Sequence, residues 1–437
     1  MQYTLLFCIC FAILIFMNKK TWFLIVLVGL SGQIAWTIEN MYFNVFLYNT
    51  ISTDPSYIAT MVASSAVVAT LTTIIMGAFS DKIGKRKPFI AIGYIIWALT
   101  VLLFAFVSPQ NFHSVKKAAI AVIVLDCVMT FFGSTANDAV FNAYITESVD
   151  NKNRTKVESV VQILPMASML LVFGLMDGLT QKGNWPLFFT ITAIIMALAG
   201  LLSFILIDDK KREREEKENN SFVYLLSYGF RKETIKNNKE LYISLIAFAF
   251  ISFAMQIFFP YLIIYIQNFL GFSQYVVLLA IVLVVASVIC VLGGKIIKRG
   301  KEVNSSFVCV AVMALGLLMM TYARSFVFTT IAGIVMMSGY LLSTSLLSAL
   351  SRGYTPKGNE GGIQGVRMVC QVMLPMVIGP FVGSIAIKGS NLTYEELGVI
   401  KTVPTPLIFT ISSVVALLSI IPLVYLKKLE SKNARIR

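Results

Sequence analysis

The sequence has few charges and almost none of the groups used in enzyme or metal chemistry. Only 13% of its 437 residues are charged, whereas a soluble globular chain has about 25%. His113 is the only histidine, no Gly-rich run ends in Gly-Lys-Ser/Thr, and the six cysteines lie in apolar runs without metal-ligand spacing. These absences argue against a soluble enzyme, an ATP-driven pump and a metal site, and they predict no cofactor.

Apolar residues make up 57% of the chain and fall into long runs. After Lys20 there are twelve such runs, and a helix needs about 20 apolar residues to cross a bilayer. We therefore predict an all-α membrane protein with twelve transmembrane helices. The expected spans are 21–48, 57–79, 89–107, 117–146, 156–180, 185–207, 241–267, 274–294, 304–322, 326–350, 362–387 and 403–426.

The cations predict how the chain is oriented in the bilayer. With Lys19 and Lys20 in the cytoplasm, 29 of the 36 Lys and Arg residues lie in cytoplasmic loops, 6 lie on the other side, and Arg367 lies in a span. Cytoplasmic loops are typically rich in Lys and Arg. We therefore expect a multi-pass plasma-membrane protein with both ends of its twelve-span core cytoplasmic. The net charge of +14 then needs no nucleic-acid partner.

One long polar segment divides the chain. Residues 208–240 hold nine cations and eight anions, typical of a solvated cytoplasmic linker. The expected organisation is an apolar extension at 1–20, six-span halves at 21–207 and 241–427 on either side of the linker, and a cytoplasmic tail at 428–437. For residues 1–17 we favour an extension outside the core over the alternative of a thirteenth helix.

The two halves share short sequence matches at equivalent spans. The matches join Gly77, Gly84 and Lys85 to Gly293, Gly300 and Lys301, and Leu164-Pro165-Met166 to Leu374-Pro375-Met376. They predict two parallel six-helix repeats with a central site at their interface. Asp81, which lies between Gly77 and Gly84, has no counterpart in the second half, because Ile297 occupies the corresponding position.

A basic loop joins the second and third spans. It runs from Gly77 through Asp81 and Gly84 to the cations Lys85, Arg86 and Lys87. This run resembles the loop signature of the major facilitator superfamily, and its continuation to Ile90 resembles the branch of proton-coupled sucrose transporters and glycoside permeases. The resemblance covers about residues 21–427. It implies the twelve-helix major facilitator fold and a secondary transporter, a proton-coupled sugar or glycoside symporter working by alternating access.

Several polar residues near the cytoplasmic side are expected to control conformation. We expect Asp81 to lie close to the start of the eleventh span and to Arg367, as a latch between the halves. The polar helix end 137–147 lies beside this gate. The predicted gate residues are Gly77, Asp81, Gly84, Lys85, Arg86, Asp138 and Arg367.

Ionisable residues inside spans are costly and are candidates for function. Asp126 lies deep in the fourth span on a polar face with Thr130, so we predict that it carries the coupling proton; Glu39 in the first span is the second candidate. A paired structural charge is the alternative for each. Sodium-coupled, melibiose-type relatives use acids on the second span, where this chain has none, so proton coupling is preferred.

A polar face on the first span predicts a substrate site. Its residues recur at helical spacing, and amides with a Trp plane suit sugar hydroxyls and the apolar face of a sugar ring. Hydrogen bonding between helices is the alternative. The predicted substrate-binding residues are Gln33, Trp36, Asn40, Asn44, Thr130, Asn137, Gln256 and Tyr261.

Two other functions stay open at this point. A proton-driven efflux antiporter for amphipathic compounds would use the same fold, and a Met- and Phe-rich interior would suit it. A membrane receptor or scaffold that moves no solute is the less favoured alternative. In either transport reading the partners are a small-molecule solute, protons and the lipid bilayer.

Overall fold

The computed structural model describes residues 19–148, 151–207, 228–297, 301–356, 360–389, 393–396 and 399–436. Residues 1–18 of the predicted N-terminal extension lie outside the described residues, as do most of the predicted linker and Gly300 of the repeat match, whereas Lys19 and Lys20 begin the first helix.

Twelve helical stretches among the described residues are long and apolar enough to cross a membrane. They confirm the twelve predicted spans and identify a multi-pass membrane protein. The first span extends beyond its predicted limits, over Lys20–Ile51. The last begins and ends later than predicted, at Leu407–Ser431, because its helix continues into the basic tail.

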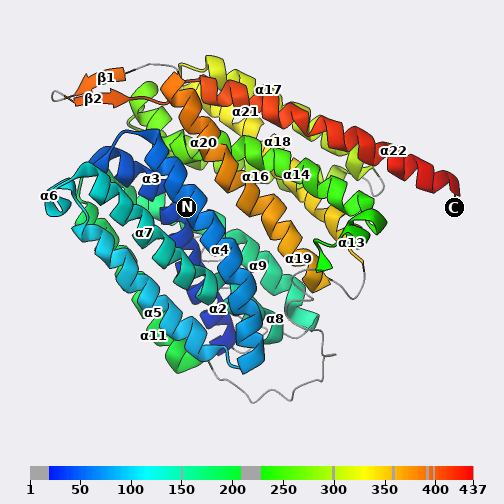
Figure 1. Cartoon of the computed structure of the whole chain (residues 1–437), viewed down its shortest axis with the longest axis horizontal. Coiled ribbons are helices and arrows are strands. Elements are labelled where there is room, and N and C mark those ends of the chain that lie inside the picture. Colours follow the sequence, from blue (N-terminus) through cyan, green and yellow to red (C-terminus); the bar gives the residue numbers. More distant parts are fainter. Residues whose placement is uncertain are drawn as a thin grey trace. The chain divides into compact units, whose positions relative to one another are not determined.

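The first six spans contain the helices that are blue to green in Figure 1. In chain order these are α2 (Lys19–Thr37), α3 (Phe43–Phe46), α4 (Pro55–Ile83), α5 (Lys87–Leu103), α6 (Pro109–Phe112), α7 (Val115–Gly133), α8 (Asn142–Ser148), α9 (Asn151–Leu171), α10 (Asp177–Gln181) and α11 (Trp185–Leu206).

The remaining helices begin with a short one before the seventh span. They are α13 (Lys232–Asn237), α14 (Lys239–Phe258), α15 (Leu262–Ile264), α16 (Tyr275–Ile296), α17 (Glu302–Tyr322), α18 (Phe326–Gly353), α19 (Glu360–Met368), α20 (Leu374–Gly389), α21 (Leu407–Leu418) and α22 (Ile420–Ile436).

A two-stranded hairpin lies between the eleventh and twelfth spans. The sequence analysis did not predict this hairpin. Strands β1 (Thr393–Glu396) and β2 (Val399–Thr402) are antiparallel, with Thr393 opposite Thr402. The β-branched residues of β2 favour an extended chain. Outside this hairpin the described chain is helical, as predicted.

Several spans are interrupted by π-helical segments, in which the helix is locally wider. Because a π turn holds an extra residue, it shifts the face on which later side chains lie. The described segments are Ile38–Tyr42, Leu47–Ile51, Ser134–Phe141, Val172–Met176, Tyr265–Phe269 and Val369–Met373. Two of them, in the first and fourth spans, contain predicted site residues.

The described residues form two compact units. One comprises the described parts of Met1–Tyr42 and Leu71–Glu215, and the other comprises Phe43–Thr70 with the described parts of Glu216–Arg437. In the first unit α5 packs along α11, and Trp22 and Ile25 of α2 pack against Val157 of α9. The segment Phe43–Thr70 thus belongs with the second unit, although it precedes the linker.

In the second unit α17 and α18 pack together most extensively, and two glycines allow their backbones to approach closely. A Cβ on Gly316 would lie 2.2 Å from the backbone nitrogen of Met336, and one on Gly339 would lie 2.3 Å from that of Met313. No side chain has room at these two positions.

We expect Gly316→Ala to destabilise the protein by about 1–3 kcal/mol, because overpacking a close contact forces the helices apart. Gly294→Ala is the matched control, since a Cβ there meets no atom within 4 Å. Thermal unfolding in detergent measures both. Equal melting temperatures for the two variants would contradict the close packing of α17 on α18.

Candidate functional site

Two buried carboxylates lie together in the first unit. Glu39, on the π-helical segment of the first span, is 8% exposed, and its Oε1 accepts a hydrogen bond from the Thr130 hydroxyl at 2.9 Å. Asp126 is 1% exposed on α7, one turn before Thr130. Asp126 and Asp138 both act electrostatically on Glu39. The structure therefore brings the two predicted proton-coupling residues to one place, where Thr130 donates to one of them.

Asp138 belongs to the same interior network. Its carboxylate accepts hydrogen bonds from Ser134 at 3.2 Å and from the side-chain amide of Asn137 at 3.1 Å. The amide oxygen of Asn137 in turn accepts from the Tyr94 hydroxyl at 3.0 Å. The sequence analysis assigned Asp138 to the gate, whereas the structure places it beside the predicted substrate-binding residue Asn137 and within electrostatic reach of Glu39.

A pair of tryptophans lies next to these acids. The rings of Trp36 and Trp97 are 4.9 Å apart, and the Trp36 indole N–H lies close to the Asp138 carboxylate without reaching hydrogen-bond geometry. A Cβ on Gly133 would lie 2.8 Å from Trp97 and 3.0 Å from Trp36, so glycine is needed for both indoles to lie against the fourth span. Sequence reasoning missed Trp97 and Tyr94, because both lie in a continuous apolar run.

The predicted polar face of the first span is divided by the structure. Gln33, Trp36 and Asn40 are half-buried in the first unit, and Asn40 donates a hydrogen bond to the Trp36 carbonyl at 2.8 Å. Asn44 is fully buried and lies in the segment that belongs to the second unit. The π-helical segment Ile38–Tyr42, which contains Asn40, lies between Trp36 and Asn44.

The two predicted substrate-binding residues of the seventh span contact neighbouring helices of the second unit. A Cβ on Gly379 of α20 would meet the side chain of Gln256 at 2.6 Å. Tyr261 is fully buried, and its hydroxyl lies 2.8 Å from the Pro380 carbonyl and 3.1 Å from the Pro55 carbonyl. The structure therefore places Tyr261 in helix packing.

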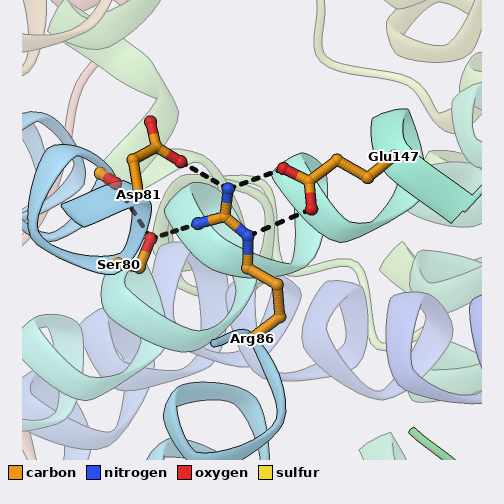
Figure 2. A network of polar contacts seen from close by, with 5 residues as sticks. Ser80, Asp81, Arg86 and Glu147 are labelled. Carbon is orange, nitrogen blue, oxygen red and sulfur yellow. Dashed lines mark hydrogen bonds and ion pairs between the residues drawn. The ribbon is translucent and has the colours of Figure 1, made fainter. Parts of the chain in front are cut away.

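The basic loop after α4 is organised around Arg86, as Figure 2 shows. The side chain of Arg86 is 6% exposed and donates to the carboxylates of Asp81 and Glu147 and to the Ser80 hydroxyl. Its second contact with Glu147, through Nε, is 3.3 Å long. Burial alone would lower the pKa of Arg86, but the hydrogen bonds that it donates to Glu147 and Asp81 outweigh this effect and raise the pKa above its ordinary value.

The other gate residues have different surroundings. Gly84 has a φ of 72°, so the turn needs the conformational freedom of glycine there. Gly77 lies inside α4, where an added Cβ would be in ordinary contact with Ala139 at 3.8 Å. Lys85 is exposed. Arg367, in the second unit, donates to the Ser351 hydroxyl at 3.0 Å, and its proximity to Asp81 stays a prediction.

A second polar cluster lies at the other end of α4, within the second unit. Lys388 of α20 forms an ion pair with Asp54 at 2.9 Å. The Tyr48 hydroxyl donates to the carbonyl of Thr402 in β2 at 2.6 Å. These contacts attach the end of the first span and the start of the second span to α20 and the hairpin. The sequence analysis did not predict them, because exposed loop charges give no pairing signal.

The surroundings of Asp54 favour its ionised form. Partial burial would raise the pKa of Asp54, but hydrogen bonds from Lys388 and from the backbone N–H of Ser56 outweigh it, so the pKa lies below its ordinary value of 3.8. Because both side chains of the ion pair are more than a third exposed, solvent screening limits what the pair contributes.

Comparison with known proteins gives one family and several distant relatives. The sequence model of the Major Facilitator Superfamily matches residues 21–380. Sugar efflux transporter A of Dickeya chrysanthemi is 24% identical over 192 residues, which are 44% of this chain and 46% of that protein. The Bicyclomycin resistance protein homolog of Haemophilus influenzae is 24% identical over 205 residues, 46% of this chain and 48% of that protein.

The fold is similar to that of solved transporters. The crystal structure of nucleoside transporter NupG superimposes with a TM-score of 0.71 at 15% identity, covering 94% of this chain and 100% of that one. At this identity the likeness concerns the fold. The matches to the two curated relatives span about half of their lengths.

We expect Arg86→Gln to destabilise the folded protein by about 1–3 kcal/mol, because it removes a buried charged donor from the carboxylates of Asp81 and Glu147 and from the Ser80 hydroxyl. Lys85→Gln removes the same charge from the neighbouring exposed position and is expected to have no such effect. Thermal unfolding in detergent compares the two. If Lys85→Gln is as unstable as Arg86→Gln, the charge of the loop stabilises the folded protein and the hydrogen bonds of Arg86 do not.

We expect the interaction free energy between Asp54 and Lys388 to be below about 1 kcal/mol. We expect it to be constant from about pH 8 to about pH 5. Because the folded-state pKa of Asp54 is depressed, the contribution is present above the ordinary value of 3.8 and is lost as the pH falls through the lower folded value. A double-mutant cycle of Asp54→Asn and Lys388→Gln, followed by thermal unfolding across pH, measures it. Loss of coupling above pH 5 would contradict this assignment.

Proposed function

The chain belongs to the major facilitator superfamily, and on that premise we propose that it is a proton-coupled transporter of sugars or glycosides that works by alternating access. Membership of the family makes it a membrane transporter of a small-molecule solute and not an enzyme. Proton coupling and the sugar class are the parts that we propose.

The observation that carries the proposal is the group of carboxylates in the first unit. Glu39 and Asp126 are almost fully buried inside spans, and Asp138 is half-buried beside them. Carboxylates that repel each other in a medium of low dielectric constant bind protons more readily than exposed ones do. Protonation and deprotonation of this group, in step with the opening of the site to either side, would couple solute movement to a proton gradient.

The polar groups next to the carboxylates support a sugar-like solute. Gln33 and Asn40 offer amide donors and acceptors, and Trp36 offers a half-buried ring against which a sugar ring can stack. One relative, which matches less than half of this chain, is named a sugar efflux transporter. Both features favour carbohydrates over other solute classes.

The direction of transport has two candidates. The resemblance of the basic loop to the sucrose-transporter branch favours uptake by symport. The name of the Dickeya chrysanthemi relative favours a second candidate, export in exchange for protons. Transport into vesicles under imposed pH gradients of either sign, across a panel of sugars, tests the function and separates the two directions.

We further propose a plasma-membrane location with both ends of the twelve-span core in the cytoplasm, which the excess of cations in alternate loops supports. In this orientation the Arg86 network lies at the cytoplasmic side and the Asp54–Lys388 pair at the opposite side. The latch between Asp81 and the start of the eleventh span belongs to the same proposal, as does the role of Arg367 beside it.

We expect Asp126→Asn and Glu39→Gln to abolish uphill accumulation of solute, because neither amide can bind and release a proton. Exchange of solute across the membrane without a gradient should persist in both variants. Counterflow and gradient-driven uptake in proteoliposomes measure the two activities separately.

Asp177→Asn is the matched control, since Asp177 is a third almost fully buried acid of the first unit. It accepts hydrogen bonds from Tyr42 at 2.9 Å and from Gln181 at 2.6 Å. We expect this variant to keep uphill accumulation. Wild-type accumulation and pH dependence in both Asp126→Asn and Glu39→Gln would refute the assignment of the proton to these acids.

A further inference from the structure

Three buried polar atoms of the first unit have no hydrogen-bond partner among the described residues. They are Oε2 of Glu39, Nε1 of Trp36 and Nε1 of Trp97. Glu39 follows Trp36 by about one helical turn, and the two indoles are in contact. Buried polar groups are nearly always hydrogen-bonded, so a group of three without partners indicates that something else supplies them. It must offer a donor to a carboxylate and acceptors to indole N–H groups.

The charged side chains described around Glu39 are themselves carboxylates. The charged groups that act on Glu39 are the carboxylates of Asp126 and Asp138. Neither Glu39 nor Asp138 forms an ion pair with any described residue, and Asp138 is held by neutral donors only. Buried anions require a proton, a cation or several donors to neutralise them. A ligand that carries a positive charge would therefore be stabilised here.

The aromatic surface beside the acids suits such a ligand. Trp36 is half-buried, with Trp97 behind it and the Asp138 carboxylate close to its indole N–H. A Trp ring offers an apolar face against which a sugar ring packs, and its electron-rich face attracts a cation nearby. Gln33 and Asn40, also half-buried, add amides at the same part of the first span. The region thus combines a carboxylate oxygen, an aromatic face and groups that bind hydroxyls.

We propose that this site binds a sugar or glycoside that carries a protonated amine, with the ammonium group at Glu39 and Asp138 and the sugar ring against Trp36. This inference rests on the proposed function, whose coupling acids it shares. A proton and an ammonium group neutralise the same carboxylates, so they exclude each other. Transport of an amine-bearing solute at this site therefore exchanges it for protons, which is the export direction of the two candidates.

A pair of matched glycosides tests the inference on the purified full-length protein. The probes are 2-aminoethyl β-D-glucopyranoside and 2-hydroxyethyl β-D-glucopyranoside, which differ in one amine. We expect the amine to bind at least about tenfold more tightly, the value of one hydrogen bond to a buried charge. We expect Glu39→Gln to remove this preference, so that the two probes bind this variant equally well, and Asp177→Asn to keep it. Equal affinities in the wild type would overturn the inference.

A second measurement needs no variant. In weakly buffered detergent solution, binding of the amine probe should release protons, whereas binding of the hydroxyl probe should not. If the hydroxyl probe binds and moves with protons while the amine probe gains nothing, the inference fails and the proposed function stands. If neither probe binds, the sugar class of the proposed function fails, and this inference fails with it.

Discussion

A carboxylate buried in an apolar helix bundle must be neutralised, and the site in the first unit follows from this constraint. Thr130 supplies one donor to Glu39, while Ser134 and Asn137 supply two to Asp138. Neutral donors stabilise an anion only in part, and two further carboxylates act on Glu39. The group therefore binds protons or cations more favourably than the rest of the interior does. Coupling to a gradient and recognition of a charged solute both depend on this property.

Much of the fold could be predicted from the sequence, because in a membrane the length of an apolar run and the charge of its flanks decide what a segment does. All twelve spans were found in this way. The hairpin was not, since eight residues of a loop carry no periodicity that separates a strand from an irregular chain. The π-helical segments were not predicted either, because an inserted residue leaves no mark in the composition of an apolar run.

The candidate site was predictable in its acids but not in its geometry. Glu39 and Asp126 are conspicuous because charges are rare in spans. Their proximity depends on the register of the first span against the fourth, which a single sequence does not contain. Trp97 and Tyr94 have the same surroundings in the sequence as lipid-facing residues of their run. The predicted face from Gln33 to Asn44 assumed regular helical spacing, whereas the π-helical segment Ile38–Tyr42 shifts the face on which later side chains lie.

The helix α4 connects two polar clusters of unequal strength. At its end, Arg86 is almost fully buried and binds two carboxylates and a hydroxyl, so removing it would break several charge-assisted hydrogen bonds at once. At its start, Asp54 and Lys388 are both substantially exposed, and such a pair contributes at most about 1 kcal/mol. A contact of that strength breaks and re-forms readily, whereas the Arg86 network keeps the loop and the helix end of Glu147 together.

The boundary between the two units falls within α4, between Thr70 and Leu71. The weaker cluster therefore belongs to one unit and the stronger one to the other, so that rearrangement is easier at the Asp54 end of the helix than at the Arg86 end.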